Sequence, residues 1–65
     1  MYLITLTFRD DLTGRDNTRR NIRNTKNAAI ENARNLKIYY GDLRHVSNVR
    51  ATIQQIETTG EAVEV

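Results

Sequence analysis

The sequence contains no cysteine and no proline, and only three of its 65 residues are glycine. Without cysteine the chain can form neither a disulfide framework nor a thiolate zinc site, which often supplement the small core of a small domain. The three glycines lie far apart, so there is no glycine-rich phosphate-binding loop. No proline segment, internal repeat or low-complexity tract divides the chain. We therefore expect a single domain over residues 1–65.

Catalytic side chains are equally scarce. Nucleophilic catalysis needs a nucleophile beside a base, and the only candidates are Ser47 and the single histidine, His45. No glycine elbow surrounds Ser47, and no acidic residue is evident that would orient the imidazole. We expect both residues to lie in a solvated loop, and we predict that the protein is not an enzyme and uses no cofactor.

A metal site is also not expected. Asp10, Asp11 and Asp16 surround Gly14, and calcium is bound by several oxygens from one tight loop. The glycine comes too early for an EF-hand, and no glutamate closes the loop at its far end. The segment is therefore interpreted as a solvated turn.

Long apolar runs are missing too. The longest is too short to span a bilayer, and Met1 leads into an alternating pattern rather than into the apolar region of a signal peptide. We expect a cytoplasmic protein with no membrane partner.

The first strand has the clearest pattern. Apolar residues alternate with other residues from Tyr2 to Arg9, which predicts a strand with one buried face. Residues 10–14 have the composition of a turn. Residues 17–23 fit an arginine-rich edge strand, because charge on an edge discourages aggregation. On that strand Thr18, Arg20 and Ile22 would share one face, and Arg19, Asn21 and Arg23 the other.

A helix is expected next, with Asn24 or Thr25 as its N-cap. The spacing of its core positions predicts a stripe facing the sheet, made of Ala29, Ala33, Leu36 and Tyr40, with Ile30 beside it. Gly41 would end the helix as the C′ residue. Ile38 lies outside the stripe, so either the helix frays before it or Ile38 and Tyr39 form a second apolar patch.

The C-terminal segment allows two interpretations. Val49, Ala51 and Ile53 alternate as in a strand. If Thr59 and Gly60 formed the centre of a hairpin, Ile56 would pair with Val63, and a bulge near Gln54 and Gln55 would bring the apolar residues to one face. Alternatively, the strand ends there. The expected fold class is α+β: a small antiparallel sheet in ββαβ or ββαββ order, with one helix packed on one face.

Charge is distributed unevenly along the chain. Residues 15–37 contain seven basic and two acidic residues, whereas the only charges in residues 51–65 are three glutamates, Glu57, Glu61 and Glu64. Such asymmetry concerns partners rather than fold. The candidate binding site for a nucleic acid or an acidic partner consists of five cations near the second strand: Arg15, Arg19, Arg20, Arg23 and Lys26.

These observations are compatible with two classes of function. The leading hypothesis is a small interaction module that binds, or inhibits, another macromolecule, with a protein partner favoured, as in phage or mobile-element accessory factors. The alternative is a DNA- or RNA-binding protein that uses the basic segment. A homodimer would compensate for a thin core, and Ile38 and Tyr39 are the candidate dimer or partner surface.

Overall fold

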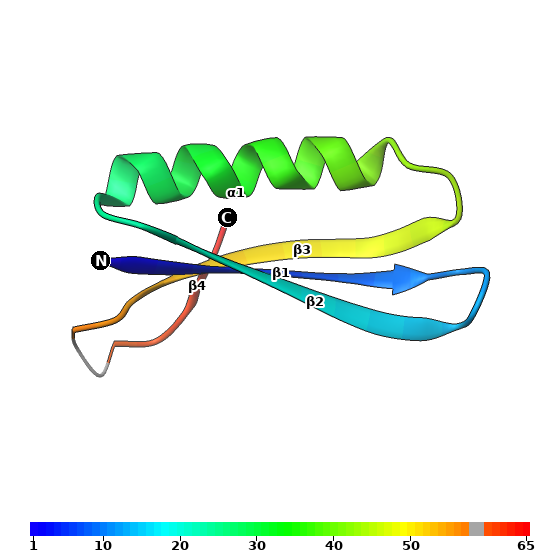
Figure 1. The fold of residues 1–65 in the computed structure, drawn as a ribbon, viewed down its shortest axis with the longest axis horizontal. Helices are drawn as coiled ribbons and strands as arrows, with labels where there is room; N and C mark the ends of the chain where they lie inside the picture. The colour runs from blue at the N-terminus through cyan, green and yellow to red at the C-terminus, as the bar shows by residue number, and fades with distance from the viewer. Residues whose placement is uncertain (58–59) are drawn as a thin grey trace.

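The computed structural model describes residues 1–57 and 60–65. Its elements are β1 (Tyr2–Asp10), β2 (Arg15–Arg23), α1 (Lys26–Gly41), β3 (Val46–Gln55) and β4 (Val63–Glu64). The strands form one antiparallel sheet in the order β2-β1-β3-β4. The helix runs along one face of this sheet and leaves the other face uncovered (Figure 1). The predicted α+β class is therefore confirmed, with the elements in ββαββ order.

The core lies between the helix and the two central strands. Ile4 and Leu6 of β1 are fully buried and are its largest fully buried side chains. They form one cluster with Ala51 and Ile53 of β3 and with Ala29, Ala33 and Tyr40 of α1. Alanine at two successive turns of the helix lets the helix lie close to the sheet. The predicted helical stripe faces the sheet, although Leu36 is only partly buried.

The helix begins at the second of the two candidate caps. Thr25 has an extended backbone, and its Oγ1 accepts a hydrogen bond from the Ala28 amide at 3.2 Å. At the other end the helix ends at Gly41 as predicted, but the C′ role is wrong, because Gly41 is the last helical residue and Asp42 is the C-cap. The Asp42 amide still donates to the Ile38 carbonyl oxygen at 3.2 Å, with φ of −88°, so the chain leaves the helix without a left-handed glycine. No helix in the described part of the chain is long and apolar enough to cross a membrane.

A β-bulge interrupts the pairing of β1 with β3. Thr7 lies opposite Arg50 and Arg9 lies opposite Ser47, which leaves one extra residue on β3 between these pairs. Asn48 in this segment has φ of +54°, a left-handed conformation that asparagine tolerates better than most residues. The bulge that the hairpin interpretation placed near Gln54 and Gln55 is wrong, since both of those residues pair regularly with β1 and β3 ends at Gln55, as the alternative interpretation has it.

The last strand, β4, pairs with β3 in a register that differs from that of the hairpin interpretation. Val63 pairs with Ile53 rather than with Ile56, so the predicted register is wrong. Ile56 lies beyond the end of β3, where its amide donates to the Met1 carbonyl oxygen at 3.0 Å. Thr59, predicted at the centre of the hairpin, lies outside the described residues. Val65 continues the pairing, because its amide donates to the Ala51 carbonyl oxygen at 2.8 Å.

Candidate functional site

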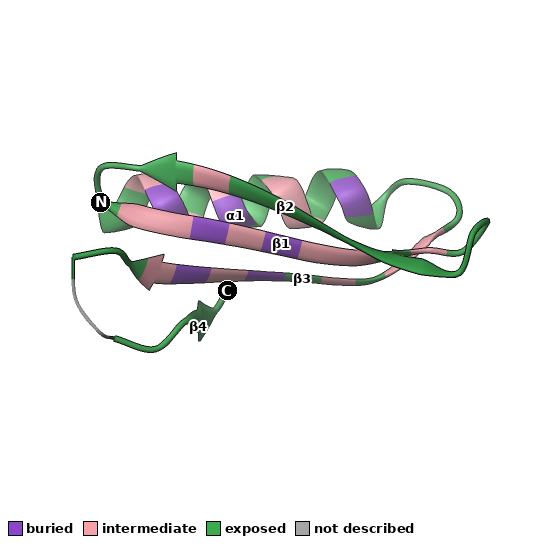
Figure 2. Ribbon diagram, turned by 60° about the horizontal axis from the view of Figure 1, so that its bottom comes forward, coloured by how far each residue is buried: buried purple, intermediate pink, exposed green. Residues whose placement is uncertain are grey.

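Strand β2 forms one edge of the sheet, and β1 is its only strand neighbour among the described residues. It carries four arginines and a single acidic residue, Asp16, and it is exposed along almost its whole length (Figure 2). Arg15, Arg19 and Arg23 are four residues apart, so they share the helix-facing side at intervals of about 13 Å. Arg20 lies on the opposite side. The structure thus confirms the predicted edge strand and divides its arginines between two faces.

The helix-facing side of β2 is anchored to α1. Arg19 donates from Nη1 to the Tyr40 hydroxyl at 2.6 Å, and its guanidinium carbon is 6.0 Å from the centre of the Tyr40 ring. Asn21 donates from Nδ2 to Asn32 Oδ1 at 3.3 Å. Arg23 makes a local bond, from Nη1 to the Ile22 carbonyl oxygen at 2.8 Å. The bonds of Arg19 and Asn21 therefore connect the edge strand to the helix, whereas that of Arg23 lies within β2.

On the uncovered face the sheet register places Arg20 among threonines. Thr5 of β1 lies opposite Arg20 of β2 and, on its other side, opposite Thr52 of β3. Thr7, two residues along β1, lies opposite Thr18 and Arg50. Side chains directly opposite one another in an antiparallel sheet share a face. Arg50 therefore belongs to the same surface as Arg20. Arg50 is not among the residues predicted from the sequence, because only the pairing of β1 with β3 shows which face it occupies.

The arginines of β2 are not neutralised. The described residues form only two ion pairs, between the Met1 ammonium and Glu57 Oε1 at 2.5 Å and between Arg9 Nε and Asp11 Oδ1 at 3.9 Å. The hydrogen bond from the Met1 ammonium is the main reason why the pKa of Glu57 lies below its ordinary value. Glu57 of the acidic tail is thus occupied at the chain terminus and does not neutralise the basic strand.

Lys26 does not join the β2 arginines. It is the first residue of α1, as predicted, and it is exposed. It lines a cleft of about 550 Å³ between the helix and the β3–β4 part of the sheet, together with Arg34, Ile30 and Val63. The cleft also contains Glu61 and Glu64, so its charge is mixed.

Ile38 and Tyr39, the candidate partner surface, are both exposed on α1, at 65% and 63% of their full accessibility. The helix continues through both residues, so it does not fray before Ile38. The Tyr39 ring lies edge-on to the Tyr40 ring, with 5.4 Å between the centroids. The structure thus contains an exposed apolar pair on the helix.

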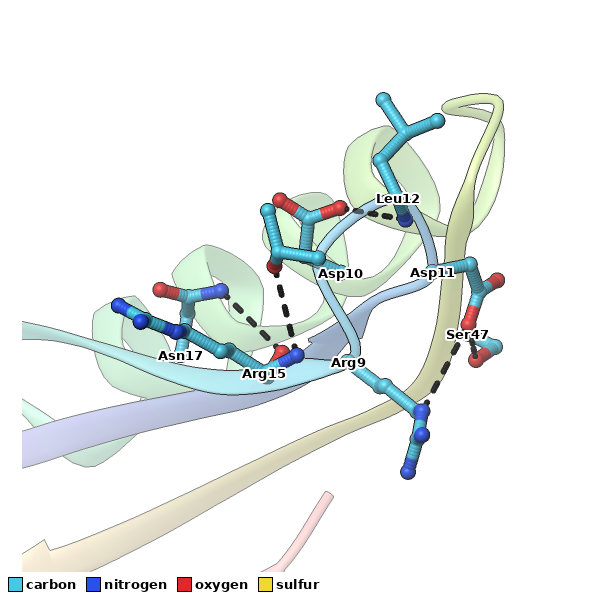
Figure 3. A network of polar contacts seen from close by, with 8 residues as sticks. Arg9, Asp10, Asp11, Leu12, Arg15, Asn17 and Ser47 are labelled. Carbon is cyan, nitrogen blue, oxygen red and sulfur yellow. Dashed lines mark hydrogen bonds and ion pairs between the residues drawn. The ribbon is translucent and has the colours of Figure 1, made fainter.

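The turn after β1 is held by its own polar network (Figure 3). Ser47 donates from Oγ to Asp11 Oδ1 at 2.8 Å, and the Asp11 amide donates to the His45 carbonyl oxygen at 2.7 Å. Asp10 accepts a bond from the Leu12 amide at 2.9 Å. Ser47 and Asp11 therefore join the β1–β2 turn to the start of β3. Within residues 1–57 and 60–65, no group of three or more histidine or acidic side chains is arranged to hold a metal ion.

No protein-family model, curated protein or solved structure matches this chain.

Proposed function

We propose that this protein is a non-enzymatic binding module and that its partner is a nucleic acid, bound with the help of the β2 arginines. The observation that carries the proposal is the state of Arg15, Arg19, Arg20 and Arg23: all four are exposed on one edge strand, and none has an ion pair among the described residues. Cations in this state can neutralise phosphates and release the counterions that surround a nucleic acid.

Protection of the sheet edge is the other explanation for these charges. Edge strands are commonly blunted by one or a few charged residues, and lysine is the usual choice. Four arginines against one acid exceed what such protection needs. The guanidinium group also presents paired donors that match phosphate oxygens, so arginine is the residue type that phosphate recognition favours.

Salt dependence tests the proposal directly. The affinity for labelled DNA and RNA, measured by fluorescence anisotropy, should fall steeply as salt rises, with a log–log slope of about 0.7 to 0.9 for each phosphate contact. The variant Arg15→Gln/Arg20→Gln, which removes one arginine from each face of β2, should lower that slope by up to about 2. Its matched control is Arg34→Gln/Arg44→Gln, which removes the same charge from the helix and the following loop. Equal affinities for the two variants, or no binding at low salt, would contradict the proposal.

A protein partner, including a second copy of the chain, is the second candidate function. It is supported by the exposure of Ile38 and Tyr39, because large exposed apolar side chains favour association. We rank it second because two side chains make a small apolar patch, whereas the cations extend along the whole of β2. Sedimentation equilibrium at micromolar concentration should show association that Ile38→Glu abolishes. A monomer whose melting temperature is independent of concentration would contradict a homodimer.

A further inference from the structure

We infer that the ligand is double-stranded DNA and that it lies against the uncovered face of the sheet, where Arg20 and Arg50 hold its two phosphate backbones. This inference rests on the proposed function and names the surface and the form of nucleic acid. It adds Arg50, a residue of another strand, to the arginines of β2.

The uncovered face is formed by every second residue of three long strands. Ile4 and Leu6 of β1 are buried beneath the helix, so the residues that alternate with them, including Thr5 and Thr7, face away from it. The register extends this face sideways to Arg20 on β2 and to Arg50 on β3. Both arginines are exposed, and neither has an ion pair within the described residues.

The distance between the two arginines suits a duplex. They lie on the strands that flank β1, two strand spacings apart, and their partners Thr5 and Thr7 are two residues apart. Strand spacing and rise then put their Cα atoms about 12 Å apart. This distance is comparable with the width of the DNA major groove, about 12 Å, so each guanidinium can reach one of the backbones that border the groove.

The side chains between the arginines are short and polar. Thr5, Thr7, Thr18 and Thr52 offer hydroxyl groups that can donate or accept hydrogen bonds, together with methyl groups. Phosphate oxygens, base edges and thymine methyl groups are all contacted by such side chains in protein–DNA complexes. The two arginines can therefore position the duplex by its phosphates, and the hydroxyl and methyl groups between them can contact its backbone or its bases.

Acidic residues lie at the margins of this face. Asp16 is opposite Arg9 at one end of β1, and Glu64 is opposite Thr52 on the short outer strand. Arg9 already forms an ion pair with Asp11, whereas Arg20 and Arg50 have none among the described residues. In the middle of the face, the row of opposite residues through Arg20 contains Thr5 and Thr52 and ends at Glu64. The row through Arg50 contains Thr7 and Thr18.

Single-stranded nucleic acid fits this face poorly. Proteins bind single strands by stacking bases on aromatic side chains, and the four aromatic residues of the chain lie elsewhere. Tyr2 and Phe8 pack against the core, Tyr40 is buried, and Tyr39 is exposed on the helix. An RNA duplex fits poorly as well, because side chains cannot enter its deep, narrow major groove.

The test compares three probes and four variants. The probes are a DNA duplex of about 20 base pairs, one of its strands, and an RNA duplex of the same sequence. The variants are Arg20→Gln/Arg50→Gln, the charge-retaining Arg20→Lys/Arg50→Lys, Arg15→Gln/Arg23→Gln on the helix-facing side of β2, and the matched control Arg34→Gln/Arg44→Gln. Thermal melting checks that each one folds, since exposed substitutions should cost less than about 0.5 kcal/mol each.

The wild-type protein should bind the DNA duplex about tenfold or more tightly than the other two probes. The Arg20→Gln/Arg50→Gln variant should lose about tenfold in duplex affinity and about 1.8 in salt slope, because two phosphate contacts are gone. The lysine variant should keep the salt slope, and the control should bind as the wild type does.

Three results would overturn the inference. If the single strand or the RNA duplex binds as well as the DNA duplex, the form of nucleic acid is wrong. If Arg20→Gln/Arg50→Gln binds like the control while Arg15→Gln/Arg23→Gln is weakened, the face is wrong and the proposed function stands. If none of the three probes binds at low salt, the proposed function fails together with the inference.

Discussion

Tyr40 connects the core with the basic edge strand. Its side chain is only 6% exposed, its ring centroid is 4.8 Å from that of Phe8, and its hydroxyl accepts the hydrogen bond from Arg19. A buried hydroxyl needs a partner, and here an arginine of β2 supplies it. Arg19 thereby has a structural role that the other arginines of β2 do not share.

Tyr40→Phe tests this role, because it keeps the ring and removes the acceptor. We expect the free energy of unfolding to fall by about 0.5 to 1.5 kcal/mol, the usual net value of such a bond. Tyr39→Phe is the matched control, and its exposed hydroxyl should contribute less than about 0.5 kcal/mol. Urea denaturation of both variants decides the matter, and equal losses would show that the bond adds no stability.

At the scale of the element, the bulge at Asn48 determines which residues of β3 reach the uncovered face. Ser47 and Arg50 are three residues apart, yet they lie opposite Arg9 and Thr7, which share a face. In a regular strand, residues an odd number apart face opposite sides. The extra residue at the bulge therefore lets both side chains lie on one surface.

Substitutions of Asn48 should separate backbone strain from side-chain contacts. With φ of +54°, a β-branched residue is strained at this position, so Asn48→Val should cost about 1 to 2 kcal/mol. Glycine tolerates this conformation, and Asn48→Gly should change the free energy of unfolding by less than about 0.5 kcal/mol. If thermal or urea unfolding showed the two variants to be equally stable, the left-handed conformation would not be the constraint.

The sequence alone predicts the elements better than it predicts their pairing. Periodicity identified β1 and the helical stripe, because a buried face imposes its own spacing on Ile4, Leu6, Ala29 and Ala33. The register of β4 and the position of the bulge depend on contacts between distant segments, which periodicity does not contain. The grouping of Arg20 with Arg50 follows from the pairing of β1 with β2 and with β3, and periodicity could not predict it for the same reason.

The whole molecule depends on a small core. Ile4 and Leu6 are its largest fully buried side chains, and much of the remaining core is alanine. A chain of 65 residues has a free energy of unfolding on the order of 3 to 10 kcal/mol, so each large core side chain is a substantial fraction of the total.

Leu6→Ala should therefore lower the free energy of unfolding by about 2 to 5 kcal/mol and leave the protein partly or wholly unfolded. Leu12→Ala makes the same chemical change in the turn, where the side chain is 73% exposed, and should have little effect. Circular dichroism during thermal melting distinguishes the two variants. Similar melting temperatures would mean that Leu6 does not lie in the core.

The two faces of the sheet differ in burial and in the side chains that they carry. The buried residues lie in β1, β3 and α1 (Figure 2), whereas the register places Arg20, Arg50 and the threonines on the face that no described element covers. Most residues of that face can change without loss of the core, so binding and folding can be tested separately.

Titration of the isotope-labelled protein with a short DNA duplex, followed by methyl NMR, shows whether DNA binds to the uncovered face. We expect the methyl resonances of Thr5, Thr7, Thr18 and Thr52 to shift as the duplex is added, while those of Ile30 and Ile38 on the helix stay in place. Shifts confined to the helix, or none at all with saturating duplex at low salt, would contradict this expectation.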